Sequence, residues 1–205
     1  MFTGVIRTIS HARKWEKKGG SLFLEIQKPH AWKIKAGDSV AVNGTCLTVK
    51  KIQLQAMVFE LMPETLSKTT FGKKIPQRVN LELPMRLSDR VNGHFVTGHV
   101  DATGKISRIT KNGTSKMVEI SFPKKFVKLV VSKGSIAVDG VSLTVTGSPS
   151  TGSGTKFSYF SVSLVSYTLE HTTLGEAKKG DIVNLEFDIL AKHILESQIS
   201  KSKNV

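Results

Sequence analysis

The amino-acid sequence predicts an all-β fold of two small closed barrels in tandem, followed by one helix. Two observations lead to this prediction. The first is an internal repeat: SVAVNGTCLTV at residues 39–49 aligns with SIAVDGVSLTV at residues 135–145, with seven identities in eleven positions. The second is the pattern in each copy, where short apolar runs flank an Asn-Gly or Asp-Gly turn, the strongest short signal of a β-hairpin. A closed barrel suits a module of this size because it leaves no sheet edge exposed.

The repeat extends along most of the chain. Further matches link residues 65–72 with 168–175, the VNLE tetrapeptide 79–82 with 183–186, and residues 2–5 with 96–99. Their offsets rise from 94 to 104 while their order is kept, so the copies differ only in loop length. We therefore expect an N-terminal barrel at 1–97, a C-terminal barrel at 98–188 and a tail at 189–205. The largest jump in offset falls at 147–155, a Gly/Ser/Pro stretch that predicts an extended hairpin loop.

The tail predicts an amphipathic helix. Its apolar residues form one stripe, and Asp188 stands just before it, where an N-cap belongs. The stripe consists of Ile189, Leu190, Ala191, Ile194, Leu195 and Ile199. Because the repeat offers this helix no partner, we expect it to mediate self-association.

Composition excludes several classes of protein. The single cysteine, Cys46, rules out an intramolecular disulfide and a Cys-rich zinc site. The start of the chain has no signal-peptide pattern and no stretch resembles a membrane span, so we expect a soluble, cytoplasmic protein. The formal net charge of +14 invites a nucleic-acid-binding interpretation, but the excess is spread over both copies and few aromatic residues flank the basic doublets. P-loop, GxGxxG, HExxH and GxSxG motifs are all missing from the sequence.

Paired positions in the two copies are the candidate functional residues. Cys46 and Ser142 both follow the hairpin turn and precede Leu-Thr-Val. Cys46 is either a small buried apolar residue or, as the paired serine suggests, part of a polar site. Hydroxyls recur at Ser39/Ser135, Thr48/Thr144 and Thr65/Thr168, where they either suit a ligand rich in hydrogen-bonding groups or simply favour strands.

Three ionisable residues are further candidates for a functional role. His99 is added to a motif that otherwise repeats Thr3-Gly4, and it is either a proton carrier or a half-exposed strand residue. Asp188 is a helix cap, an acid/base group or both. His94 precedes His99 by five residues, but no third ligand has metal spacing, so we expect no metal site.

The motifs together resemble the riboflavin synthase family of the alpha type. The resemblance is carried, in order, by MFTGVI, NGTCLTV, MPETLSKTTFG, GHFVTGHVDATG, DGVSLTV, HTTLG and VNLEFD, and it spans residues 1 to about 190. It implies two six-stranded Greek-key barrels related by a pseudo-twofold axis, and a C-terminal helix that assembles a homotrimer. It also implies the dismutation of two 6,7-dimethyl-8-ribityllumazine molecules by transfer of a four-carbon unit. Neither a metal nor an organic cofactor is implied, and lumazine synthase is a candidate partner.

The resemblance also implies the site. His99, Cys46, Ser142 and Asp188 would be the polar groups nearest the reacting rings, with His99 as an acid/base group. The N-barrel site would further contain Gly4, Val5, Ile6, Ser39, Leu47, Thr48, Glu60, Leu61, Met62, Pro63, Glu64, Thr65, Gly98 and Val100. The C-barrel site would contain Lys133, Leu143, Thr144, Ser163, Leu164, Val165, Ser166, Tyr167 and Thr168.

One departure from the family pattern keeps a second hypothesis open. The first copy reads Met-Pro-Glu-Thr at 62–65, whereas the second reads Ser-Tyr-Thr at 166–168 and lacks the Pro-Glu pair. A non-catalytic lumazine or flavin carrier of the same fold is therefore the alternative to an enzyme.

Overall fold

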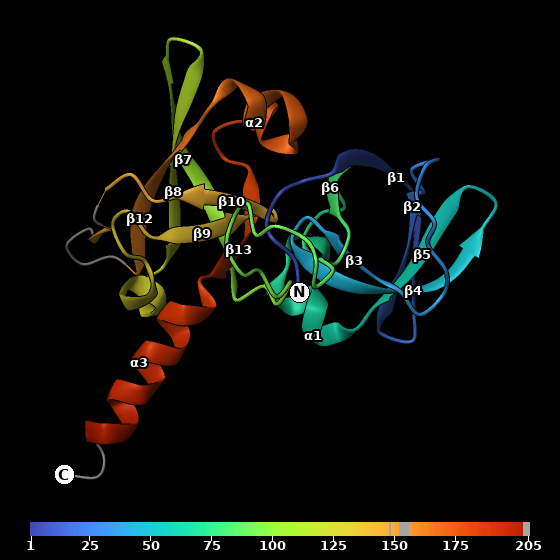
Figure 1. The fold of residues 1–205 in the computed structure, drawn as a ribbon, viewed down its shortest axis with the longest axis horizontal. Helices are drawn as coiled ribbons and strands as arrows, with labels where there is room; N and C mark the ends of the chain where they lie inside the picture. Colours follow the sequence, from blue (N-terminus) through green and yellow to red (C-terminus); the bar gives the residue numbers. More distant parts are fainter. Residues whose placement is uncertain (148, 152–155, 203–205) are drawn as a thin grey trace.

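The N-terminal half is a closed barrel of six antiparallel strands (Figure 1). The structure is a computed structural model that describes residues 1–147, 149–151 and 156–202. The strands close in the order β1-β2-β5-β4-β3-β6. Their bounds are β1 Thr8–Lys18, β2 Ser21–Gln27, β3 Ser39–Val42, β4 Thr45–Gln53, β5 Ala56–Leu61 and β6 Arg78–Glu82, with α1 at Pro63–Lys68 and a 3-10 turn, η1, at Thr70–Gly72.

The C-terminal half repeats these elements with one addition. Its described strands form one antiparallel sheet in the order β10-β9-β13-β7-β8-β12-β11, and a single bridge between Val145 and Val162 joins the end of β10 to β12. The bounds are β7 Ala102–Asn112, β8 Ser115–Pro123, η2 Lys124–Leu129, β9 Ser135–Val138, β10 Val141–Thr144, β11 Ser150–Thr151, β12 Phe157–Leu164, α2 Ser166–His171, η3 Thr173–Gly175 and β13 Ile182–Phe187.

The C-terminal half has seven described strands, whereas six were expected. In the first copy β4 runs on to Gln53 and pairs with β5, whereas its counterpart β10 ends at Thr144. The chain then supplies the two-residue strand β11, which pairs with Tyr159 and Ser158 of β12. The predicted loop at 147–155 lies partly outside the described residues.

The two halves meet where their hairpin turns touch. Gly44 and Gly140 pack so closely that a Cβ on either would lie 2.6–2.7 Å from the backbone nitrogen of the other. Asn43 and Asp139, which precede them, have φ of 44° and 45°, as expected at the first central position of a type I′ turn. The Asn-Gly and Asp-Gly hairpins are therefore confirmed, and they also form the contact between the halves.

Two asparagines of the repeated VNLE tetrapeptide cross this contact in opposite directions. Asn80 of β6 donates from Nδ2 to the Asp139 carbonyl at 3.0 Å, and Asn184 of β13 donates to the Asn43 carbonyl at 2.8 Å. Each also accepts, at Oδ1, a backbone N–H of the other half, from Thr173 and Thr70 respectively. The Nδ2 and Oδ1 atoms of both asparagines are thus hydrogen-bonded across the interface, as buried polar groups require.

The C-terminal helix, α3 (Ile189–Ser202), projects away from both halves (Figure 1). Asp188 caps it, because its Oδ1 accepts the backbone N–H of Leu190 at 2.9 Å. Leu190 and Ile194 are each 59% exposed, so this part of the expected apolar stripe has no cover within the chain. Ile199 lies where side chains are not described. Among the described residues, no helix is both long and apolar enough to cross a membrane.

Candidate functional site

The β3–β4 hairpin presents its reactive side chains on the outside of the barrel. Along β4, Leu47 and Val49 are buried in the core, whereas Cys46 is half-buried and Thr48 is exposed. Ser39 of β3 lies directly opposite Thr48, and residues opposite each other share a face of the sheet. The thiol and both hydroxyls therefore belong to one outward face.

The β9–β10 hairpin repeats this face. Ser142 and Thr144 point outward between the buried Val141, Leu143 and Val145, and Ser135 lies opposite Thr144. The polar interpretation of the Cys46/Ser142 pair is consistent with these positions, since neither residue is fully buried. The same alternation places Leu47 and Leu143 in the cores, where only their backbones remain accessible to a ligand.

Two short segments, which we call straps, are held by equivalent buried glutamates. The first strap, Thr3–Gly4, donates three hydrogen bonds of 2.7–3.0 Å to the carboxylate of Glu82 in β6. The second strap, Thr97–Gly98, makes the same three bonds, of 2.6–2.9 Å, to Glu186 in β13. Burial raises the pKa of both glutamates, and the hydrogen bonds from the straps oppose this shift. The last residue of the VNLE repeat thus fixes a strap in each copy.

Each strap lies on the hairpin of the opposite half. The Gly4 carbonyl of the first strap accepts the Ser142 N–H at 2.8 Å, and the Gly98 carbonyl of the second accepts the Cys46 N–H at 2.8 Å. Only glycine fits, because a Cβ on Gly4 or Gly98 would lie 2.6 or 2.5 Å from the Cβ of Ser142 or Cys46.

The crossing corrects one part of the sequence interpretation. We expected Gly4, Val5 and Ile6 to line the N-barrel site with Cys46. Gly4 instead contacts Ser142, and Ile6 packs against the core of the C-terminal half. The physical reason is that the first strap is held by its own barrel through Glu82 but covers the other barrel's hairpin. Gly98 does lie beside Cys46, as expected, and His99 follows it as an exposed residue whose N–H donates to Thr97 Oγ1 at 3.2 Å.

A histidine that we considered only as a metal ligand lies against Ser142. His94 Nδ1 is 2.7 Å from Ser142 Oγ, and the side chain is only 9% exposed. Burial lowers the pKa of His94, and the charge of Asp188 opposes this shift. His94 therefore lies against Ser142 and within electrostatic reach of Asp188. The internal matches begin at residue 96 in the second copy, so the repeat does not include His94.

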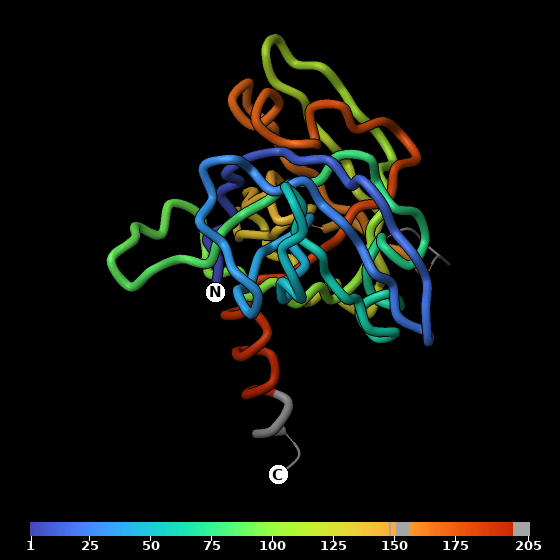
Figure 2. The backbone as a smooth tube through the Cα atoms, turned by 90° about the vertical axis from the view of Figure 1, so that its right-hand side faces the viewer, coloured from blue at the N-terminus to red at the C-terminus, as the bar shows by residue number. Residues whose placement is uncertain are grey.

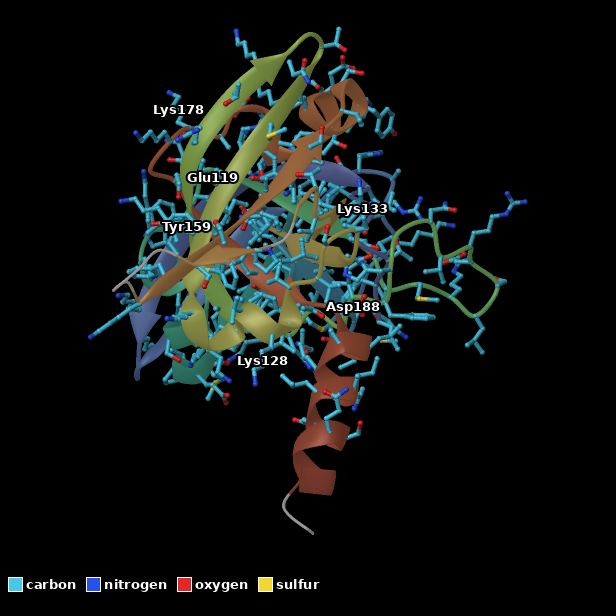
Figure 3. The ribbon with its side chains drawn as sticks, turned by 90° about the vertical axis from the view of Figure 1, so that its left-hand side faces the viewer. Glu119, Lys128, Lys133, Tyr159, Lys178 and Asp188 are labelled. Atoms are coloured by element: carbon cyan, nitrogen blue, oxygen red, sulfur yellow. The ribbon has the colours of Figure 1, made fainter. Side chains whose placement is uncertain are left out.

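Lys133 occupies a backbone position that favours glycine. Its N–H donates to the Val145 carbonyl at 2.9 Å, just as that of Gly37 donates to Val49 in the first copy, at 2.8 Å. Both residues have positive φ, 64° for Lys133 and 91° for Gly37. A lysine in this conformation costs about 1 kcal/mol relative to glycine. Figure 3 shows Lys133 in the C-terminal half, above Asp188 at the start of α3.

The ends of β5 and β12, with the segments that follow them, differ in charge between the copies. In the first, Glu60 pairs with Lys50 at 2.5 Å and Glu64 with Lys68 at 2.8 Å, in front of the half-buried Thr65. In the second, Tyr167 stacks on His171 with ring centroids 4.0 Å apart, at the positions of Glu64 and Lys68. Glu64 and Tyr167 are exposed, as are Met62, Pro63, Ser163, Val165 and Ser166, whereas Leu61 and Leu164 are buried.

One groove lies apart from the expected site. It has a volume of about 240 Å³ and runs along the outer face of β8 and β12, where Glu119 and Tyr159 line it (Figure 3). None of the residues that we expected to bind a ligand lines this groove.

Comparison with known proteins identifies relatives over nearly the full chain. The Lumazine binding domain family matches twice, at residues 3–84 and 97–188. A riboflavin synthase of Actinobacillus pleuropneumoniae is 37% identical over 203 residues, which cover 98% of this chain and 91% of the relative. A riboflavin synthase of Mycobacterium tuberculosis (strain ATCC 25618 / H37Rv) is 40% identical over 197 residues, which cover 95% of this chain and 96% of the relative.

Solved structures agree on the fold. LumP complexed with 6,7-dimethyl-8-(1'-D-ribityl) lumazine superposes with a TM-score of 0.75 at 24% identity, over 91% of this chain and 99% of that one. LumP complexed with riboflavin gives a TM-score of 0.77, also at 24% identity and with the same coverage.

Proposed function

The chain belongs to the riboflavin synthase family, and we propose that it converts two molecules of 6,7-dimethyl-8-ribityllumazine into riboflavin and 5-amino-6-(D-ribitylamino)uracil. One lumazine gives a four-carbon unit to the other, so the enzyme is a transferase. The two products together contain every atom of the two substrate molecules. The reaction therefore balances without a co-substrate.

The observation that carries this proposal is the duplicated outward face. Donor and acceptor are the same compound, so the reaction needs two similar sites that hold two rings in a fixed mutual orientation. Cys46 with the second strap and Ser142 with the first are such a pair, since their backbones make identical contacts. The differences between the copies then separate the roles of donor and acceptor.

The chemistry requires a proton acceptor and polar contacts to the rings. The C7 methyl of the lumazine is acidic because its anion is delocalised into the ring, and its deprotonation makes one molecule a carbon nucleophile. We assign His99 as an acid/base group beside Cys46, and Ser142 with Asp188 as the polar groups of the other site. The exposure of His99 next to Gly98 supports this assignment, because a base must reach bound substrate.

The remaining binding residues follow from the outward faces. Ser39, Thr48 and Thr144 have exposed or half-buried hydroxyls that can bind a ribityl chain or a ring amide. The strained backbone of Lys133 favours a role for its ammonium group, since glycine would suit the fold better. We propose that the other family positions named from the sequence contribute side chains or, where these are buried, backbone groups to the two sites.

We further propose a homotrimer in which the N-terminal site of one subunit faces the C-terminal site of another. The uncovered Leu190 and Ile194 on the projecting α3 support this assembly. An Ile194→Glu variant should shift the sedimentation coefficient to that of a monomer and abolish turnover. A monomeric wild type that is active would contradict the trimer. The barrel boundaries 1–97 and 98–188, the tail 189–205, the cytoplasmic location and the association with lumazine synthase stay predictions.

Incubation of the purified protein with 6,7-dimethyl-8-ribityllumazine alone tests the proposed reaction. Riboflavin absorbance should rise, and one pyrimidinedione should form per riboflavin. The alternative is a non-catalytic carrier, which the Ser166-Tyr167 departure favours. Tight binding of lumazine without product would establish the carrier, and absence of binding would exclude both functions.

A further inference from the structure

The side chain of His94 is enclosed between the first strap and the Ser142 hairpin. Its backbone N–H donates to the Thr3 carbonyl at 3.1 Å, which pairs the segment with the first strap. The preceding Gly93 allows this approach, because a Cβ there would lie 2.1 Å from the Thr3 oxygen and 2.9 Å from Ser142 Oγ. Gly93 and His94, which precede the second strap, thus bring the His94 imidazole against the Ser142 hydroxyl.

The unpaired nitrogen of this imidazole indicates its tautomer. His94 Nε2 is buried and has no hydrogen-bond partner among the described residues. A buried N–H without a partner is rarer in proteins than an unsatisfied acceptor, so the proton belongs on Nδ1. Burial also lowers the pKa of the ring, with the charge of Asp188 opposing, which keeps the imidazole neutral near pH 7.

This tautomer determines the direction of the Ser142 hydroxyl. If Nδ1–H donates to Ser142 Oγ at 2.7 Å, that oxygen becomes an acceptor on the side of His94. The backbone N–H of Ser142 is already bound to the Gly4 carbonyl. The hydroxyl proton is then free to point away from both segments, toward the outward face.

We propose that His94 is a positioning residue that holds Ser142 Oγ through Nδ1–H, so that the hydroxyl donates to an acceptor atom of the ligand ring bound at the C-terminal site. The carbonyl oxygens and ring nitrogens of a pteridine are the acceptors that fit. This inference rests on the proposed function for the identity of the ligand, but the tautomer and the hydrogen bond are properties of the free protein.

Substitutions that mimic one nitrogen at a time test the proposal. Asn places its amide near Nδ1, whereas Gln places its amide near Nε2. We expect His94→Leu to lower kcat/KM about tenfold, the effect of losing one hydrogen bond, and His94→Asn to recover most of it. His94→Gln should resemble the Leu variant. Thermal midpoints of all three identify any loss of folding, and the comparison of Asn with Gln remains decisive if the Leu variant does not fold.

A double-mutant cycle shows whether His94 acts through Ser142. In a Ser142→Ala background, a second substitution His94→Asn or His94→Leu should have no further effect on kcat/KM. Independent, additive effects, or equal activity of the Asn and Gln variants, would overturn the proposal. The ring ¹⁵N shifts of His94 in the free protein should show protonated Nδ1, and protonated Nε2 would overturn it as well. A wild type that neither binds nor converts lumazine contradicts the proposed function instead, while the ¹⁵N result still decides the tautomer.

Discussion

The buried carboxyl of Asp139 should make the stability of the protein depend on pH. Asp139 lies at the contact between the two halves, where its Oδ1 accepts the Asn184 N–H at 2.8 Å. Burial raises its pKa from 3.8 to about 7, although this hydrogen bond opposes the shift. The first copy has the uncharged Asn43 at the same position, and its Oδ1 accepts the Asn80 N–H in the same way, at 2.7 Å.

The direction of this pH dependence follows from how tightly the folded and unfolded states bind the Asp139 proton. Between pH 3.8 and about 7 the folded protein binds the Asp139 proton more tightly than the unfolded chain, so stability falls as pH rises and levels off above 7. The full shift of roughly 3 pKa units corresponds to about 4 kcal/mol, of which about 2 kcal/mol is lost between pH 5.5 and 8.

Asp139→Asn should remove this loss. The amide oxygen can still accept the Asn184 N–H, and asparagine tolerates a φ of 45° as well as aspartate does. We expect urea unfolding to give the variant a higher free energy of unfolding than the wild type at pH 8, with the difference about 2 kcal/mol smaller at pH 5.5. The matched control is Asn43→Asp, which should be less stable than the wild type at pH 8. A difference between Asp139→Asn and the wild type that stays constant from pH 5.5 to 8 would refute the reasoning.

Three further predictions concern close contacts and strained backbone. Gly44→Ala should lower the thermal midpoint far more than Gly113→Ala, because both positions have positive φ but only Gly44 has backbone within 3 Å of the added Cβ; equal shifts would contradict the tight turn contact. Glu186→Gln should release the second strap and raise the rate at which a thiol reagent modifies Cys46, since an amide cannot accept all three hydrogen bonds from the strap; an unchanged rate would show that the strap does not cover the thiol. Lys133→Gly should raise the free energy of unfolding by about 1 kcal/mol and weaken lumazine binding at the same time, and unaltered affinity would remove Lys133 from the site.

Local signals in the sequence predicted the elements that carry the site. The Asn43-Gly44 and Asp139-Gly140 turns were predictable because the left-handed conformations they need favour few residues. The outward direction of Cys46 and Ser142 follows once the hairpins are known, since side chains alternate along a strand. The short strand β11 was not predicted, because the point where β10 stops pairing depends on the tertiary course of the chain.

Long-range partners were beyond the reach of such signals. The VNLE repeat was visible, but nothing local shows that Asn184 binds the Asn43 carbonyl or that Glu82 holds Thr3. The crossing of the straps could not be predicted for the same reason, because an internal repeat does not show which copy's hairpin a segment contacts. His94 was missed for a different reason: the repeated motifs do not include it, so comparing the two copies did not draw attention to it.

The crossed straps have the arrangement of a domain-swapped homodimer, here contained in one chain. Two separate single-module polypeptides that exchanged their first few residues would make the same reciprocal contacts about a true symmetry axis, with each chain's start completing the other's hairpin face. Gene duplication and fusion need only a connection from β6 to the second strap, and the loop that projects between β6 and β7 provides it (Figure 2). After fusion, the sequences of the two hairpin faces can change independently. In a symmetric ancestor every substitution would appear in both sites, whereas here Cys46 and Ser142, or Gly37 and Lys133, are free to specialise for two different partners in one reaction.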